Sequence, residues 1–139
     1  MPSLIKKTSI YISLLFIAVC TGCKTTSIQN EKPLEYTSIE DARKYFDRGM
    51  MYNKEKNRVQ AISNFSLAIK LDPSLQRAYL YRGLTYHDIG RYSEAIQDFT
   101  KAILLEPQDI TEYSLTYCFR GNSYYMTGEY NEAINDLTK

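Results

Sequence analysis

Apolar residues recur at helical spacing along most of the chain after residue 36. They return every three or four positions, which places them on one face of an α-helix rather than on alternate faces of a strand. The pattern predicts a pair of helices joined by a short polar segment. The face of the first helix carries Ala42, Tyr45, Gly49 and Tyr52, and that of the second carries Ala61, Phe65 and Ala68.

This pair of helices belongs to an internal repeat. Residues 45–52 match residues 79–86 at an offset of 34, and residues 117–124 continue the series at an offset of 38. The third copy therefore has four extra residues between Pro107 and Gly121. Four residues are close to one helical turn, so we expect a longer helix whose faces keep their direction.

Stacking of the repeats predicts how the core forms. Gly and Ala at matching positions let the two helices of a pair approach closely, and aromatic rings fill the space around them. One pair of helices cannot bury both of its faces, so each pair must pack against the next. The residues expected at that second contact are Ile62, Ile69, Ile96 and Ile103.

Local signals predict where the helices begin. Thr37 with Glu40 forms a capping-box pattern, and Asp109 with Glu112 forms an acidic version of it. Asp72 precedes a proline, which is typical of a cap followed by the first residue of a helix.

The turns inside the pairs carry glycine in two of the three copies. Gly90 and Gly128 lie in the second and third turns, whereas Lys56 occupies that position in the first. Glycine tolerates the left-handed conformation that ends many helices, so we expect the first turn to be less regular.

The period and the order Tyr, Gly, Tyr, Ala, Phe, Ala, Pro resemble the tetratricopeptide repeat. The resemblance covers residues 42–139 and implies an all-α solenoid of antiparallel helix hairpins over residues 37–139. It implies two complete repeats and a truncated third, at about residues 42–75, 76–109 and 114–139.

One departure from the family recurs in every copy. Arg48, Arg82 and Arg120 stand where the family usually has Leu. The second and third copies carry an aspartate in the other helix, so we expect Arg82 to reach Asp98 and Arg120 to reach Asp136. The first copy has an asparagine there. The alternative is three solvated arginines whose stems cover the turn.

Composition and charge exclude several classes of function. The chain has 17 basic and 16 acidic residues, so no excess of positive charge draws it to nucleic acid. Most of its 13 tyrosines lie at repeat positions, which favours packing over stacking with bases. One histidine, without HExxH, GxSxG or a Gly-rich phosphate loop, predicts no enzyme, no metal site and no cofactor.

The amino terminus forms a targeting signal. Two lysines precede an apolar stretch at residues 10–19, which is too short to cross a bilayer but has the length of a secretory signal. With Gly22 before Cys23, it resembles a bacterial lipoprotein signal. The resemblance implies removal of residues 1–22, lipidation of Cys23 and a polar tether over residues 23–36. The protein would be a membrane lipoprotein of the bacterial cell envelope, in the outer membrane facing the periplasm. Ordinary signal cleavage and an uncleaved anchor are the alternatives.

The tetratricopeptide family places partner contacts in a concave groove lined by the first helices of the repeats. Here each of the first two such helices has a second apolar stripe, formed by Phe46 with Met50 and by Leu80 with Leu84. The alternative is that this stripe is core in a tightly wound superhelix. The expected groove residues are Arg43, Phe46, Met50, Asn53, Arg77, Leu80, Leu84, His87, Leu115, Cys118, Asn122 and Tyr125.

Some arrays of this family clamp the C-terminal carboxylate of a partner with Lys and Asn. Those positions hold Phe46, Met50, Tyr81, Leu115 and Phe119 here. We therefore expect an apolar helix or extended segment as the ligand.

Two functions are consistent with this sequence. The first is a membrane-tethered adaptor that binds a protein or peptide partner in the envelope. The second is the anchored part of a larger protein whose C-terminal part carries an enzymatic or signalling domain, since Lys139 falls eight residues short of completing the third repeat. Otherwise we expect Ile134 and Leu137 to be covered by a partner or by self-association with a second copy. Whether the reading frame continues past Lys139 separates the two.

Overall fold

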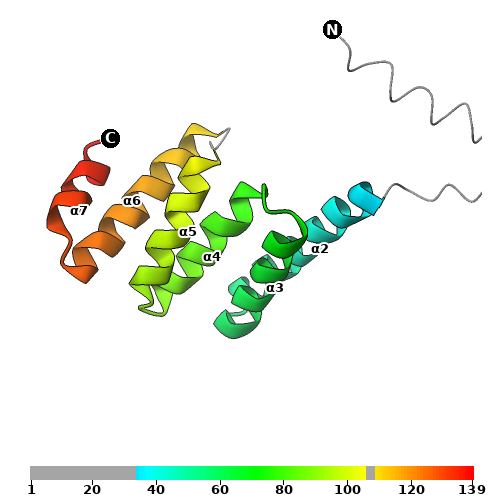
Figure 1. The fold of residues 1–139 in the computed structure, drawn as a ribbon. Coiled ribbons are helices and arrows are strands. Elements are labelled where there is room, and N and C mark those ends of the chain that lie inside the picture. Colours follow the sequence, from blue (N-terminus) through cyan, green and yellow to red (C-terminus); the bar gives the residue numbers. More distant parts are fainter. Residues whose placement is uncertain (1–33, 106–108) are drawn as a thin grey trace, which may run out of the picture. The chain divides into compact units, whose positions relative to one another are not determined.

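The structure, a computed structural model, describes residues 34–105 and 109–139. These residues belong to the unit Lys32–Lys139, and they form six α-helices and no strand (Figure 1). The helices are α2 (Leu34–Lys54), α3 (Arg58–Leu71), α4 (Gln76–Asp88), α5 (Tyr92–Leu104), α6 (Ile110–Thr127) and α7 (Tyr130–Leu137). The predicted signal and Cys23 lie outside the described residues, while residues 34–36, predicted as tether, belong to α2.

Consecutive helices pair into three hairpins, α2 with α3, α4 with α5, and α6 with α7. Neighbouring hairpins pack through α3 with α4 and through α5 with α6, so that they follow one another in a row (Figure 1). This arrangement confirms the predicted all-α solenoid with two full hairpins and a shorter third. The third is shorter because α7 has 8 residues where α5 has 13.

The two helices of a hairpin approach each other at a glycine. A Cβ atom at Gly49 would lie 2.6 Å from the ring of Phe65, and one at Gly83 would lie 2.8 Å from the ring of Phe99. Both rings are fully buried. Any larger residue would separate the helices, because an interior packed at this density has no room for a displaced ring.

The same phenylalanines also reach the next hairpin. The ring of Phe65 lies 6.4 Å from that of Tyr81, and the ring of Phe99 lies 6.4 Å from that of Phe119. Ile69 packs against the hydrophobic clusters of both the first and the second hairpin, as the sequence predicts. One continuous core therefore runs through the stack.

Arg82 connects three helices with a single guanidinium group. Its Nε and Nη2 donate to the two carboxylate oxygens of Asp98, both at 2.7 Å, while Nη1 donates to the hydroxyl of Ser66 at 2.9 Å. Asp98 lies in α5 of the same hairpin and Ser66 lies in α3 of the preceding one. The guanidinium carbon also lies 5.9 Å from the ring centres of both Tyr79 and Tyr86.

The third hairpin repeats this arrangement. Arg120 donates to Asp136 through Nε at 2.6 Å and Nη2 at 2.8 Å, and its Nη1 donates to the hydroxyl of Thr100 in α5 at 3.1 Å. Both predicted Arg–Asp pairs are thus confirmed. Arg48 is exposed and has no carboxylate partner among the described residues, so the alternative of a solvated arginine holds for the first copy.

Burial and pairing shift the pKa values of Arg82 and Asp98 in opposite directions. Burial raises the pKa of the Asp98 carboxyl, and the Arg82 guanidinium opposes this shift without cancelling it. Burial lowers the pKa of Arg82, but the hydrogen bonds and charge of Asp98 raise it above its ordinary value. Each member therefore depends on the other, because either one alone would be a buried and unpaired charge.

Two of the predicted helix starts are wrong. Helix α2 begins three residues before Thr37, so Thr37 is not its cap. Asp72 ends α3 instead of starting α4, which begins at Gln76. The Asp72 carboxylate accepts hydrogen bonds from the N–H and hydroxyl of Ser74, at 2.9 and 2.6 Å. It forms a turn between the helices because Asp bonds equally well to loop and to helix N–H groups.

Helix α6 begins where the sequence predicts. Asp109 is its cap and accepts a hydrogen bond from the N–H of Thr111 at 2.8 Å. The helix has 18 residues against 13 in α4, and the additional turn consists of residues 110–113. The four inserted residues therefore lengthen the helix at its start, as expected.

The turn of the first hairpin is as regular as the other two. Lys56 has a positive φ of 61°, close to the 76° of Gly90 and the 86° of Gly128. In each turn a tyrosine carbonyl accepts the N–H five residues later, at 2.9, 2.9 and 2.8 Å. The expectation of a less regular turn is wrong, because the conserved hydrogen bond holds Lys56 in a conformation that is strained for its side chain.

We expect Lys56→Gly to raise the free energy of unfolding by about 0.5–1 kcal/mol, because the left-handed backbone is unstrained for glycine. Gly90→Ala is the matched opposite change and should lower it by about 1 kcal/mol, since a Cβ at Gly90 meets no atom within 4 Å and only the backbone is strained. Urea unfolding measures both. A destabilised Lys56→Gly variant would contradict the interpretation.

We expect Arg82→Leu to lower the free energy of unfolding by about 3 kcal/mol at pH 7, because it leaves Asp98 buried without its partner. The unpaired Asp98 would have a pKa further above its unfolded value. Its destabilising effect should therefore shrink as the pH falls through that raised pKa and Asp98 becomes neutral.

Urea unfolding at pH 7 and pH 5, with Arg48→Leu as the exposed control, measures this effect. The control should stay within about 0.5 kcal/mol of the wild type at both values. Equal losses for the two arginine variants, or a loss from Arg82→Leu that grows on acidification, would show that the pair has no such role.

Candidate functional site

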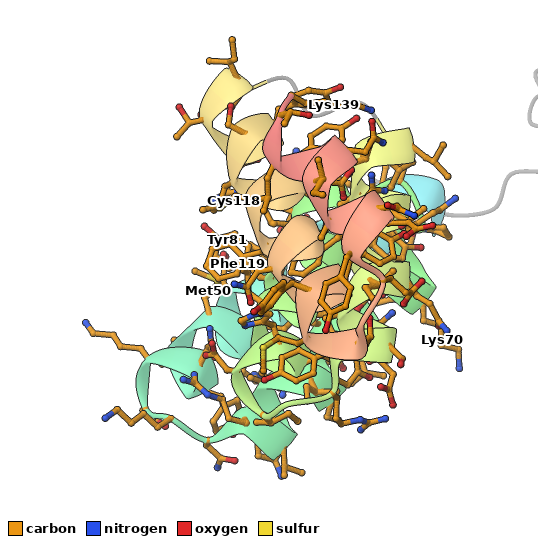
Figure 2. The ribbon with its side chains drawn as sticks, turned by 90° about the vertical axis from the view of Figure 1, so that its left-hand side faces the viewer. Met50, Lys70, Tyr81, Cys118, Phe119 and Lys139 are labelled. Carbon is orange, nitrogen blue, oxygen red and sulfur yellow. The ribbon has the colours of Figure 1, made fainter. Side chains whose placement is uncertain are left out.

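The first helices of the three hairpins, α2, α4 and α6, lie next to one another. Figure 2 shows Met50, Tyr81, Cys118 and Phe119 from these helices on one side of the molecule, with Lys70 of α3 on the opposite side. We call the surface formed by these four side chains and their neighbours on α2, α4 and α6 the first-helix face.

Aromatic side chains connect α2 with α4 at this face. The ring of Phe46 meets that of Tyr81 edge-on, with 5.7 Å between the ring centres. The guanidinium carbon of Arg77 lies 5.3 Å from the Phe46 ring centre and 5.7 Å from that of Tyr81. Arg77 is therefore held over two rings that belong to different helices.

An ion pair connects α4 with α6. Nε of Arg77 lies 3.0 Å from Oε1 of Glu112, with the arginine side chain 52% and the glutamate side chain 21% exposed. Burial lowers the pKa of Arg77, while its contact with the Tyr81 hydroxyl and the charge of Glu112 more than offset this effect. Arg77 thus remains a cation on a partly exposed surface.

His87 forms the second connection between α4 and α6. Its Nε2 hydrogen-bonds to Oδ1 of Asn122 at 2.9 Å, and its ring packs edge-on against Phe119, with 5.3 Å between centres. Tyr92 of α5 packs against the other side of the imidazole at 5.4 Å. These contacts give His87 a structural part in joining the second and third hairpins.

Two residues expected in an exposed stripe are buried instead. Leu80 is 0% exposed and packs with Phe99, and Phe46 is 7% exposed and packs with Phe65. Both side chains fill the inside of the hairpin stack, so the alternative of a core stripe holds for them. Met50 and Leu84 are partly buried against the same clusters.

The remaining expected groove residues differ in exposure. Cys118 is exposed although it follows Phe46 and Leu80 in the repeat, because side chains of the next hairpin pack on Phe46 and on the Leu80 cluster, and no described hairpin follows the third. Asn53 and His87 are half-buried. The exposed members of the set are Arg43, Arg77, Leu115, Cys118, Asn122 and Tyr125.

Three residues at this face were not among the expected groove residues. Tyr81 and Phe119 occupy equivalent positions in the second and third copies, and from the sequence both stand where related arrays carry their clamp residues. Glu112 reads as a capping residue in the sequence. Its role as the partner of Arg77 depends on the extra turn of α6, which brings it over α4.

The described part of the chain has neither a cluster of metal-binding side chains nor a helix able to cross a membrane. It contains no group of three or more His, Cys, Asp or Glu side chains that could hold a metal ion. None of its helices combines the length and the apolar character needed to cross a membrane.

Residues 77–109 match the family model of the tetratricopeptide repeat. Comparison with the curated proteins gives no significant match. Solved structures match over most of the chain. The second TPR domain of Spaghetti (RPAP3), bound to the HSP90 peptide SRMEEVD, is 30% identical with a TM-score of 0.68, over 75% of this chain and 92% of that one.

Two further structures show the same fold. The TPR domain of Arabidopsis OM64 is 25% identical with a TM-score of 0.65, over 71% of this chain and 78% of that one. The second TPR domain of human RPAP3, in complex with the HSP70 peptide SGPTIEEVD, is 29% identical with a TM-score of 0.62, over 73% and 79%. The sequence period of 34 residues, the stacked hairpins and these matches together show the family. The chain belongs to the tetratricopeptide repeat proteins.

Proposed function

We propose that this protein is a non-catalytic adaptor that binds a segment of another protein on its first-helix face. The observation that supports it most is the continuous series of partly exposed aromatic and sulfur-containing side chains across α2, α4 and α6, represented by Met50, Tyr81, Phe119 and Cys118. Partly exposed apolar side chains that adjoin across helices are typical of an interaction surface. Two of the similar structures contain a bound peptide.

The chemistry of the face favours an apolar segment. The positions at which related arrays carry a Lys and Asn carboxylate clamp hold Phe46, Met50, Tyr81, Leu115 and Phe119. Apolar side chains of a ligand would pack on the partly exposed rings of Tyr81 and Phe119 and on the Met50 thioether, which adapts to irregular shapes. The face is built on helices held by the core, so little ordering cost falls on the receptor.

We expect the double change Met50→Lys and Cys118→Lys to abolish binding, because two added charges would lose their solvation beneath an apolar ligand. The control is Val59→Lys with Leu104→Lys, which adds the same charge at positions 75% and 70% exposed on the second helices. The measurement is enrichment of peptides from a random heptapeptide display library on the full chain. Helical circular dichroism should remain unchanged in both variants.

Equal loss of binding in the control, or binding that survives in the folded Met50 and Cys118 variant, would place the binding surface elsewhere. Leu80→Ser is unsuitable for this test, because Leu80 is fully buried and its replacement would disturb the core.

We also propose that Cys23 anchors the protein to a membrane of the bacterial cell envelope. The support is the sequence alone: an apolar stretch at residues 10–19 followed by a small residue and a cysteine. A cysteine that carries three acyl chains binds a bilayer stably, whereas one chain binds only marginally.

We expect Cys23→Ser to leave the precursor uncleaved or to release the protein from membranes, because the acceptor thiol for the lipid is missing. Labelling with radioactive palmitate and membrane fractionation measure both effects, with Cys118→Ser as the matched control that should label normally. Palmitate labelling that persists in Cys23→Ser would contradict the assignment.

A further inference from the structure

We infer that Arg77 is the recognition site for a glutamate side chain of the bound segment, and that Glu112 occupies this site in the free protein. The inference rests on the proposed function, because it specifies one contact of a ligand on the first-helix face. It predicts a ligand that is apolar apart from one glutamate.

The geometry around Arg77 is that of a prepared anion site. Its guanidinium is held over the rings of Phe46 and Tyr81, at 5.3 and 5.7 Å from their centres. Contact with two rings restricts the rotation of a long side chain, so less entropy is lost when an anion binds. Arg77 also lies in the first turn of α4, where the helix dipole favours negative charge.

Glu112 shows which chemical group fits the site. Its carboxylate contacts Nε of Arg77 at 3.0 Å. The ligand group is thus a carboxylate on a flexible stem, delivered from a neighbouring segment of backbone, as a glutamate in a bound peptide would deliver it. The partly exposed Tyr81 and Met50 on the same face supply apolar contacts for the residues next to that glutamate.

The pair of Arg77 with Glu112 is more exposed than the pair of Arg82 with Asp98. Arg82 holds Asp98 through two hydrogen bonds of 2.7 Å in a buried site, whereas Arg77 remains 52% exposed beside Glu112. Exposed ion pairs contribute little free energy, because water competes for both charges. A ligand carboxylate can therefore displace Glu112, while it could not displace Asp98.

The position of Glu112 in the sequence supports a role at the first-helix face rather than in the packing of the repeats. It lies in the four-residue insertion that only the third copy has, so the repeat does not require it for packing. The residue of the first hairpin that is equivalent to Arg77 is Arg43, which is exposed. Of these two equivalent arginines, Arg77 is the one with both ring contacts and a carboxylate partner among the described residues.

The test selects peptides from a random heptapeptide display library with the full-length wild type and with Arg77→Gln, Glu112→Gln and Arg48→Gln. We expect glutamate to be enriched on the wild type and on the Arg48→Gln control, more strongly enriched on Glu112→Gln, and not enriched on Arg77→Gln. Apolar residues should be enriched on all four proteins. Fluorescence anisotropy then measures the affinity of a selected peptide and of its Glu-to-Gln form.

For the selected peptide, Glu112→Gln should bind about two- to fivefold more tightly and Arg77→Gln about tenfold more weakly than the wild type. The Glu-to-Gln peptide should bind Arg77→Gln and the wild type equally. Enrichment of glutamate that persists on Arg77→Gln, or weaker binding to Glu112→Gln, would overturn the inference while leaving the proposed function intact. If no apolar peptide is enriched on any of the proteins, both fail.

Discussion

A single arginine at the same position of the second and third copies connects each hairpin with the one before it. Arg82 joins α4 and α5 to α3, and Arg120 joins α6 and α7 to α5. Hydrophobic packing between hairpins is not directional, because methyl groups and rings can slide with little change in buried area. Two hydrogen bonds to an aspartate and one to a hydroxyl have fixed directions. They therefore fix how far one hairpin is rotated against the next.

The geometry of the first-helix face depends on that rotation. Arg77, Glu112, His87 and Asn122 lie within contact distance because α4 and α6 stand side by side. A small rotation of the third hairpin would separate all of these groups at once. We do not attribute net stability to the ion pairs, since the cost of desolvating two charges offsets much of their attraction. Their contribution is to select one arrangement among several that the apolar core would tolerate.

The features that the sequence predicted correctly are mostly those that recur in each copy of the repeat. The helices, the hairpins and the Arg–Asp pairs follow from residues that recur at fixed offsets, so each copy supports the interpretation of the others. Two local features that differ between the copies were predicted wrongly. Asp72 forms a turn because capping residues bond to loops as readily as to helices, and Lys56 takes a left-handed conformation that only its surroundings enforce. Leu80 and Cys118 occupy equivalent positions, yet one is buried and the other exposed, because a following hairpin packs on the Leu80 cluster and no described hairpin follows Cys118.

The most direct test is a double-mutant cycle between Ser66 and Arg82, which belong to different hairpins. Urea unfolding of the wild type, Ser66→Ala, Arg82→Lys and the double variant gives their coupling free energy, since lysine keeps the charge but loses the planar set of donors. The arrangement seen in the structure predicts a coupling of about 0.5–1.5 kcal/mol. Changes that add to within about 0.3 kcal/mol would show that the arginine does not connect the two hairpins, and the account of the stack would then be wrong.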